Sequence, residues 1–290
     1  MTTAYWVMEA DDAGRPGPPL IVAHGGPGCT HDYLLSLTDL VRPGRRVVFY
    51  DQVGNGASSH HPDLPTEQWN VDLFLDELDA LLDAIGCREE YDLLGQSWGG
   101  MLAAEHAVRR PAGLRRLVVA NSPASMPRWR RAAAELRSAL PPDVRRTLEA
   151  HEAAGTIDSA EYRAASDVFY ARHVCRMDDL PAEVAATFAW VDADPTVYRA
   201  MNGPTEFHVI GSLREWTVED RLTAIAVPTL VVNGRYDEAS DDTVEPFLSL
   251  IPQVTSHRFE HSSHMPHWEE REEYMRVIGT FLDGPDTAHR

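Results

Sequence analysis

Short apolar runs alternate with segments of helical periodicity along the first 122 residues of the chain. The runs lie at 18–26, 45–52, 90–97 and 114–122, and they lead into residues such as Gly, Asp or Ser. Continuous apolar runs of this length are typical of parallel strands that are buried on both faces. Their alternation with helices predicts an α/β fold built on a mostly parallel sheet.

The intervening segments have the spacing of amphipathic helices. Between residues 70 and 85 one helical stripe collects Val71, Phe74, Leu75, Leu78, Leu81, Leu82 and Ile85. Gly86 follows this stripe and is expected to cap the helix. A second, Ala-rich helix is predicted at 99–110, where Pro111 stops it. Ser97 therefore lies at a turn between a strand and a helix.

The strand pattern disappears between about residues 122 and 226 and then returns. The intervening stretch is rich in Ala, Arg and Glu and is interrupted by prolines, which predicts an inserted helical cap at 122–226. The core would then comprise residues 1–121 and 227–290. Within it, strands are expected at 227–237 and 256–264 and a last helix at 268–282. The first 23 residues have room for one or two antiparallel strands, with a turn at 11–19.

Composition and charge exclude several classes of partner. The formal net charge is −19, so the surface repels nucleic-acid phosphates and anionic lipid. No apolar run approaches the roughly 20 residues of a membrane span, and no secretory signal is visible, so a cytoplasmic location is expected. All 26 basic residues are Arg, which removes Schiff-base chemistry and the lysine of phosphate-binding loops.

The cysteines give no sign of a metal or redox site. Cys29, Cys87 and Cys175 are an odd and widely spaced set, which is typical of reduced thiols, and they form no CxxC pair. His261, His264 and His267 are separated by two residues each, which matches no common ligand pattern on one face. No metal and no cofactor are therefore expected.

The pentapeptide Gly95-Gln96-Ser97-Trp98-Gly99 matches the G-x-S-x-G nucleophile elbow. The match is weak by itself, since chance gives it in roughly one such sequence in fifteen. Its position after an apolar strand and before a helix is where this turn must lie, because the first helical N–H groups then face the reacting carbonyl. Ser97 is therefore the predicted nucleophile.

A serine hydroxyl needs a base, and the base needs an acid to orient it. Hydrolases with this elbow carry the acid and then the histidine further along the chain. Asp237 follows the strand at 227–237, and His264 follows the next strand, so these two are predicted to complete the triad. The competing acids are Asp241 and Asp242, and the competing histidines are His257, His261 and His267.

A glycine-rich turn, HGGPG, follows the first buried strand. Glycine permits close approach of backbone N–H groups to a substrate, so the N–H groups of Gly26 and Trp98 are predicted to form the oxyanion hole. Gly25 is counted among the substrate-binding residues. The segment from Asp51 to Gly56 is interpreted as a structural turn beside the site.

Together these motifs make the chain similar to the proline iminopeptidases of the α/β-hydrolase fold, and especially to the tricorn-interacting aminopeptidases among them. The likeness spans nearly the whole chain, and HGGPG (24–28) and MNGPTEF (201–207) are its most specific segments. The resemblance implies an α/β-hydrolase fold, with a mostly parallel central sheet flanked by helices and an inserted helical cap.

The resemblance also implies how a substrate would be bound. In that family two glutamates bind the free α-amino group, and the matching positions here are Glu206 and Glu238. Two carboxylates select an ammonium because a blocked N-terminus leaves their charge uncompensated. Tyr198 matches a family position near the substrate pocket.

The leading hypothesis is therefore a serine exopeptidase that releases the first residue, proline or another apolar one, from small peptides or amino-acid amides through an acyl-enzyme. An esterase, an amidase or a specialised acyl hydrolase of a small metabolite is the alternative, because fold and triad do not choose the acyl donor. A catalytically silent binding protein, or an accessory subunit docked on a larger protease, is an alternative of another class; self-association is also left open.

Overall fold

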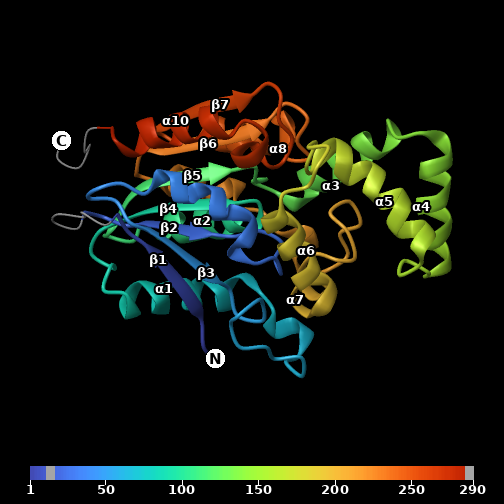
Figure 1. Cartoon of the computed structure of the whole chain (residues 1–290), viewed down its shortest axis with the longest axis horizontal. Coiled ribbons are helices and arrows are strands. Elements are labelled where there is room, and N and C mark those ends of the chain that lie inside the picture. Colours follow the sequence, from blue (N-terminus) through green and yellow to red (C-terminus); the bar gives the residue numbers. More distant parts are fainter. Residues whose placement is uncertain (11–16, 285–290) are drawn as a thin grey trace.

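The computed structural model describes residues 1–10 and 17–284, so most of the turn predicted at 11–19 lies outside the described residues. The described strands form one seven-stranded sheet in the order β1-β3-β2-β4-β5-β6-β7 (Figure 1). All neighbours are parallel except β1 and β3, which are antiparallel. The strands are β1 (Ala4–Met8), β2 (Leu20–Ala23), β3 (Val47–Asp51), β4 (Tyr91–Gln96), β5 (Leu114–Ala120), β6 (Thr229–Gly234) and β7 (Val254–Phe259). The predicted α/β architecture is confirmed. Of the one or two antiparallel strands expected near the N-terminus, the described residues form one, β1.

Consecutive residues of the central strands contribute to two different apolar layers. Because successive side chains of a strand point to opposite faces, Ile21, Leu93 and Val119 lie in one buried cluster. Their neighbours Val22, Leu94 and Val118 lie in another. This two-sided burial explains why the central strands are continuous apolar runs rather than alternating ones.

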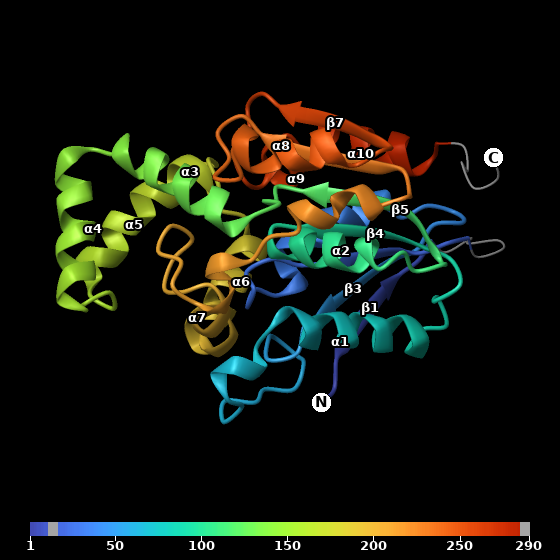
Figure 2. The ribbon, with the colours of Figure 1, turned by 180° about the vertical axis from the view of Figure 1, so that it is seen from behind.

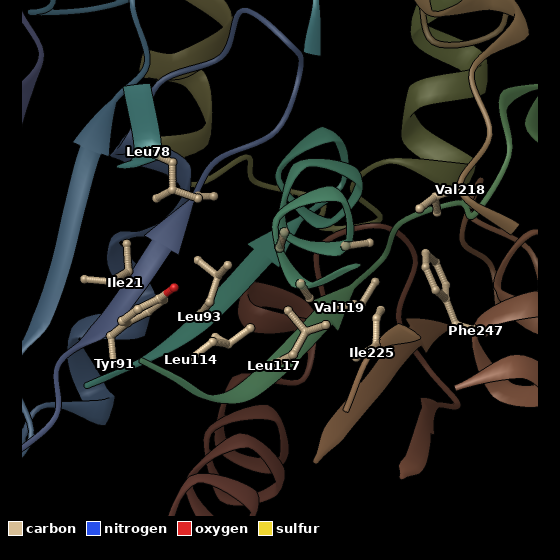
Figure 3. Close-up of a cluster of buried hydrophobic side chains, with 14 of the residues drawn as sticks. Ile21, Leu78, Tyr91, Leu93, Leu114, Leu117, Val119, Val218, Ile225 and Phe247 are labelled. Atoms are coloured by element: carbon tan, nitrogen blue, oxygen red, sulfur yellow. The ribbon is translucent and has the colours of Figure 1, made fainter. Parts of the chain in front are cut away.

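The first layer is covered by α1 (Val71–Ala84), α2 (Trp98–Val108) and α8 (Asp241–Leu250). Figure 2 shows α1 and α2 lying across the sheet, and Figure 3 shows Leu78 of α1 pointing toward the strands. The helix α1 begins at Asn70, whose side chain accepts a hydrogen bond from the Leu73 N–H, and Gly86 follows it with a φ of +65°. Both ends agree with the sequence prediction.

The second layer is covered by the 3₁₀ helix η1 (His31–Leu40) and by α10 (Arg271–Leu282). The predicted last helix at 268–282 is interrupted, because Glu270 has φ −130° and ψ 50° and separates α10 from the short α9 (Pro266–Glu269). The Glu270 carboxylate accepts hydrogen bonds from the His261 N–H and the Ser262 hydroxyl, so this break is tied to the preceding loop.

Helices fill the chain between β5 and β6. They are α3 (Met126–Ser138), α4 (Pro142–Ala154), α5 (Ala160–His173), α6 (Ala182–Ala193), α7 (Thr196–Met201) and the 3₁₀ helices η3 (Ser212–Glu215) and η4 (Glu219–Ala224). One more 3₁₀ helix, η2 (Thr66–Gln68), lies earlier in the chain, between β3 and α1. The hairpin of α4 and α5 lies at the end of the molecule farthest from β1 (Figure 1). Val218, Leu222 and Ile225 are buried in the cluster that holds Ile21, so the last part of this stretch packs with the core. The cap and core limits stay a prediction.

No helix among residues 1–10 and 17–284 is long and apolar enough to cross a membrane.

Replacing Leu78 by Ala tests the packing of α1 on the sheet. Leu78 is fully buried, so Leu78→Ala should lower the free energy of unfolding by about 2–5 kcal/mol through lost burial and a residual cavity. The control is Leu248→Ala on α8, which is 38% exposed and should change it by about 0.5 kcal/mol or less. Urea unfolding measures both, and equal effects would contradict this packing.

Candidate active site

The predicted site residues lie at the carboxyl ends of neighbouring parallel strands. The chain passes from β2 to β3 on one side and continues from β4 to β5 on the other, so the strand order reverses between β2 and β4. Ligands of open α/β sheets bind at such a point. Gly26 follows β2 and Ser97 follows β4, and both line a common pocket with Glu206.

Ser97 carries the backbone strain of the elbow itself. Its φ is +57° and its ψ is −124°, a conformation that side-chain-bearing residues rarely adopt. The two flanking positions require glycine because a side chain would clash there. A Cβ on Gly95 would come 2.0 Å from the carbonyl oxygen of Gly99, and a Cβ on Gly99 would come 2.0 Å from the carbonyl oxygen of Ala23. Glycine is thus needed for close packing of the turn against β2, and the strain falls on the serine.

Asp237 and His264 are in direct contact. Nδ1 of His264 lies 2.7 Å from Oδ1 of Asp237, and both residues are buried. Oδ1 also accepts from the Ala239 N–H at 2.8 Å, and Oδ2 accepts from the Asn121 amide at 2.6 Å and from the Gly234 N–H at 3.4 Å. These donors fix the carboxylate, which leaves Nε2 of His264 directed away from it. His264 and Ser97 line one pocket.

The surroundings of His264 favour its cationic form. Burial alone lowers the pKa of His264, but the charge of Asp237 and the hydrogen bond to it outweigh burial and raise that pKa above its ordinary value of 6.5. The charges of Glu206 and Glu269 act in the same direction. This is the electrostatics expected of a base that becomes an imidazolium during the reaction.

The competing residues lie in other surroundings. Asp241 and Asp242 are at the start of α8 and accept from surface arginines. His257 is on β7, His261 is exposed, and Nε2 of the buried His267 donates to a backbone carbonyl. No group of three His, Cys, Asp or Glu side chains suited to a metal ion occurs in the described parts of the chain.

The two predicted oxyanion donors, the N–H groups of Gly26 and Trp98, come from two different segments beside Ser97. Trp98 is the first residue of α2, so its N–H belongs to the helix turn that has no partner within the helix. Gly26 has a φ of +113°, which favours glycine, and an added Cβ there would meet the Gly28 nitrogen at 2.4 Å. Both residues line the pocket that contains Ser97.

Gly25 is placed behind this pocket. Its N–H donates to the Tyr33 hydroxyl at 2.7 Å, and its carbonyl accepts from the Cys29 N–H at 3.3 Å. A Cβ on Gly25 would come 2.9 Å from Cβ of Ser97. The predicted substrate contact of Gly25 does not follow from this placement, because its polar groups already bond within the protein; Gly25 supports the close approach of two loops.

Glu206 and Glu238 line the pocket that contains Ser97 and His264. Glu238 is 1% exposed, and among the described residues neither of its carboxylate oxygens has a hydrogen-bond partner. Its Oε1 lies 3.8 Å from Nε2 of His264. Burial, and then the charges of Glu206 and Asp237, raise the pKa of Glu238 well above its ordinary value.

Tyr198 is hydrogen-bonded to Glu206 and is not among the residues that line the pocket of Ser97 and His264. Its hydroxyl donates to Oε1 of Glu206 at 2.6 Å, while the Glu206 carbonyl accepts from the Trp129 indole at 2.8 Å. Burial raises the pKa of Glu206, and the Tyr198 hydrogen bond opposes this shift. Side chain and backbone of Glu206 are thus both fixed by the helical segment.

A cavity of about 550 Å³ adjoins the site between α5, α6 and α7. It reaches Cys29, Tyr198 and Glu206, and it shares Val174 and Phe188 with the pocket of Ser97. A volume of this size is typical of small-molecule sites.

Several buried polar residues of the site were not found from the sequence. They are Asn121, which bonds to Asp237, and Tyr33, Gln52 and Gln96, which connect the loops around Ser97. Gln52, Gln96 and Asn121 lie at the ends of apolar runs, which is a weak signal, whereas no such signal marks Tyr33. Only the tertiary contacts show what each of them bonds to.

The α/β-hydrolase fold family matches residues 18–271 of the chain. Together with the strand-to-helix serine turn, this match defines the protein as a serine hydrolase of the α/β-hydrolase family.

Comparisons with individual proteins point to a narrower family. The chain is 37% identical over 264 residues to the proline iminopeptidase of Saccharolobus solfataricus, with 91% of this chain and 84% of the relative covered. It is 48% identical to the crystal structure of proline iminopeptidase from Mycobacterium smegmatis (TM-score 0.90, 97% and 94% covered). It is 54% identical to the crystal structure of VinJ (TM-score 0.94, 97% and 94% covered). The chain belongs to the proline iminopeptidase family, as its motifs predicted.

The raised pKa of His264 predicts the acidic limb of the pH profile. Only neutral imidazole accepts the Ser97 proton, so kcat/KM should rise with pH through the pKa of His264 in the free enzyme. With an aryl acetate, which does not titrate, the midpoint should lie above 6.5. A midpoint at or below 6.5 would contradict the role given to Asp237.

Proposed function

We propose that this protein is a serine exopeptidase that removes an unblocked first residue, proline or another apolar one, from small peptides or amino-acid amides. Membership of the proline iminopeptidase family and the geometry around Ser97 support an aminopeptidase. The single observation that carries the amine specificity is the buried Glu238 carboxylate, because it has no hydrogen-bond donor among the described residues.

The proposed reaction passes through an acyl-enzyme. Nε2 of His264 takes the hydroxyl proton as Oγ of Ser97 attacks the substrate carbonyl, and Asp237 stabilises the imidazolium. The Gly26 and Trp98 N–H groups stabilise the negative oxygen of the tetrahedral intermediate. The imidazolium then gives its proton to the leaving amine. Water activated by His264 hydrolyses the ester and releases the amino acid.

The distance between Glu238 and His264 indicates where the α-amino group of the substrate would bind. In an α-amino acid the ammonium nitrogen is two bonds from the carbonyl carbon, so its binding group must lie close to the reacting atoms. Oε1 of Glu238 is 3.8 Å from Nε2 of His264, which satisfies this requirement. A carboxylate at this distance is placed to accept the α-ammonium of the residue whose carbonyl is attacked.

The charge balance favours a cationic amine. A buried carboxylate without donors is costly, and Glu206 and Glu238 raise this cost for each other. A primary ammonium supplies a positive charge and three N–H donors, and the secondary ammonium of an N-terminal proline supplies the charge and two. An acetylated primary amine supplies one neutral donor, an acetylated proline supplies none, and both add bulk, so the blocked substrates should bind far more weakly.

A specialised acyl hydrolase remains the second candidate, and the cavity between α5, α6 and α7 is the observation that favours it. At about 550 Å³ it is larger than a single side chain requires. An ester or amide whose acyl portion is larger than a single amino acid would fit this candidate. The preferred leaving group then decides between peptide and metabolite.

The experiment compares kcat/KM for prolyl and leucyl arylamides with free and acetylated amines. Wild type should hydrolyse the free-amine substrates and fail on the blocked ones. Ser97→Ala should lose about 10⁶-fold in kcat if Ser97 is the nucleophile. Glu238→Gln should lower kcat/KM for free-amine substrates by about 100-fold, because a buried charged partner is removed.

Two controls distinguish a loss of amine specificity in Glu238→Gln from a loss of folded structure. Glu215→Gln changes a carboxylate whose side chain is 73% exposed, so it should behave as wild type. Glu238→Gln should still react with a fluorophosphonate, which carries no amine. Equal rates on free and acetylated substrates would refute the amine role and favour the acyl-hydrolase candidate.

A further inference from the structure

Tyr33 connects the three segments that carry the proposed chemistry. It lies in η1, is 2% exposed, and its hydroxyl accepts a hydrogen bond from the Gly25 N–H at 2.7 Å. The same hydroxyl donates to Oε1 of Gln96. The Gln96 amide in turn donates to the His264 carbonyl at 3.0 Å. One buried hydrogen-bond chain thus touches the residue before Gly26, the residue before Ser97, and His264 itself.

The backbone of Tyr33 anchors the segment that follows His264. Its carbonyl accepts from the Trp268 indole at 2.6 Å and from Nε2 of His267 at 3.1 Å. Burial lowers the pKa of His267 to about 3, so this imidazole is neutral and its one proton is on Nε2. Burial also raises the pKa of the Tyr33 hydroxyl, which therefore keeps the proton that it donates to Gln96.

Gln52 makes a second connection on the other side of Ser97. Its Oε1 accepts from the Trp98 indole at 2.8 Å, and its Nε2 donates to the His24 carbonyl at 2.8 Å. Its backbone N–H donates to Nε2 of His24 at 2.9 Å. Burial lowers the pKa of His24 to about 4, so Nδ1 carries the ring proton and donates to the Gly25 carbonyl.

We propose that Tyr33 and Gln52 are positioning residues that fix the spacing of the Gly26 and Trp98 N–H groups around Ser97. Tyr33 joins Gly25 to Gln96, and Gln52 joins His24 to Trp98, so each side chain links the loop after β2 to the turn after β4. This inference rests on the proposed oxyanion hole and is independent of the amine specificity.

The physical reason is the narrow distance range of an oxyanion hole. Its donors act when they lie about 2.7–3.1 Å from the negative oxygen, and misplacement by about 1 Å costs about 100-fold in rate. Gly26 is in a glycine-rich loop, and an N–H at Gly25 without its acceptor would be unpaired and buried. The loop would then relax toward another acceptor and carry the Gly26 N–H with it.

The test is Tyr33→Phe, with Tyr50→Phe as the matched control. Tyr50 is also fully buried, but its hydroxyl has no hydrogen-bond partner among the described residues, so its removal should leave the rates unchanged. The first readout is the rate constant for labelling of Ser97 by a fluorophosphonate. In that step an Oγ–P bond forms, the P–F bond breaks, fluoride leaves, and the hydroxyl proton passes to His264. The phosphoryl oxygen takes the place of the oxyanion.

Labelling and kcat should fall about 10- to 100-fold in Tyr33→Phe, while KM for a free-amine arylamide stays within about twofold. A general loss of structure would instead change KM and labelling together. Gln52→Met removes the other connection and should produce the same pattern. In the double variant the losses should combine less than multiplicatively, because both side chains act on one pair of donors.

Labelling of Tyr33→Phe at the wild-type rate would overturn the proposal, and so would a loss that appears only in KM. If Tyr33→Phe fails to fold, Gln52→Met decides by the same criteria. Failure of the proposed function has a different signature: wild type would then be labelled by the fluorophosphonate but would not distinguish free from acetylated arylamides.

Discussion

The parallel register of β2, β3, β4, β5, β6 and β7 brings the carboxyl ends of six strands to one edge of the sheet. Gly95 pairs with Ala23, and Gln96 pairs with Ala120. Each loop that leaves this edge contributes one part of the site, from Gly26 after β2 to His264 after β7. The apolar layers on both faces of the sheet hold this register, because a slip of one residue would exchange the two layers.

Two adjacent carboxylates at this edge have opposite surroundings. Asp237 accepts hydrogen bonds from His264, Asn121 and the backbone N–H groups of Ala239 and Gly234. Glu238, the next residue, has no hydrogen-bond partner for either oxygen among the described residues. Asp237 is therefore suited to orient an imidazole, whereas Glu238 is suited to receive a charged ligand. Two consecutive residues of one turn therefore have different proposed roles, Asp237 in catalysis and Glu238 in substrate binding.

The sequence was sufficient for a mostly parallel sheet flanked by helices and for the family, because these depend on apolar periodicity and on local glycine-rich motifs. It also placed Ser97, Asp237 and His264 at strand ends, where the structure brings them together. The break at Glu270 was missed, since it is stabilised by bonds to His261 and Ser262 rather than by a local signal.

The roles of individual residues required tertiary contacts. The elbow motif alone does not show that the positive φ belongs to Ser97, whereas the flanking glycines permit close packing. Gly25 was expected to bind substrate, yet its N–H bonds to Tyr33. No pattern marks Tyr33, and Gln52 is marked only by its place at the end of an apolar run. A buried polar side chain acquires its role from the partners that the fold supplies.

The most direct measurement is a crystal structure of Ser97→Ala with a bound prolyl arylamide. The account predicts that the substrate ammonium lies within hydrogen-bond distance of both Glu206 and Glu238, with the carbonyl oxygen directed at the Gly26 and Trp98 N–H groups. A complex in which the amine points away from these carboxylates, while the carbonyl occupies the same place, would contradict the central claim that the buried Glu238 and the half-buried Glu206 select a free N-terminus.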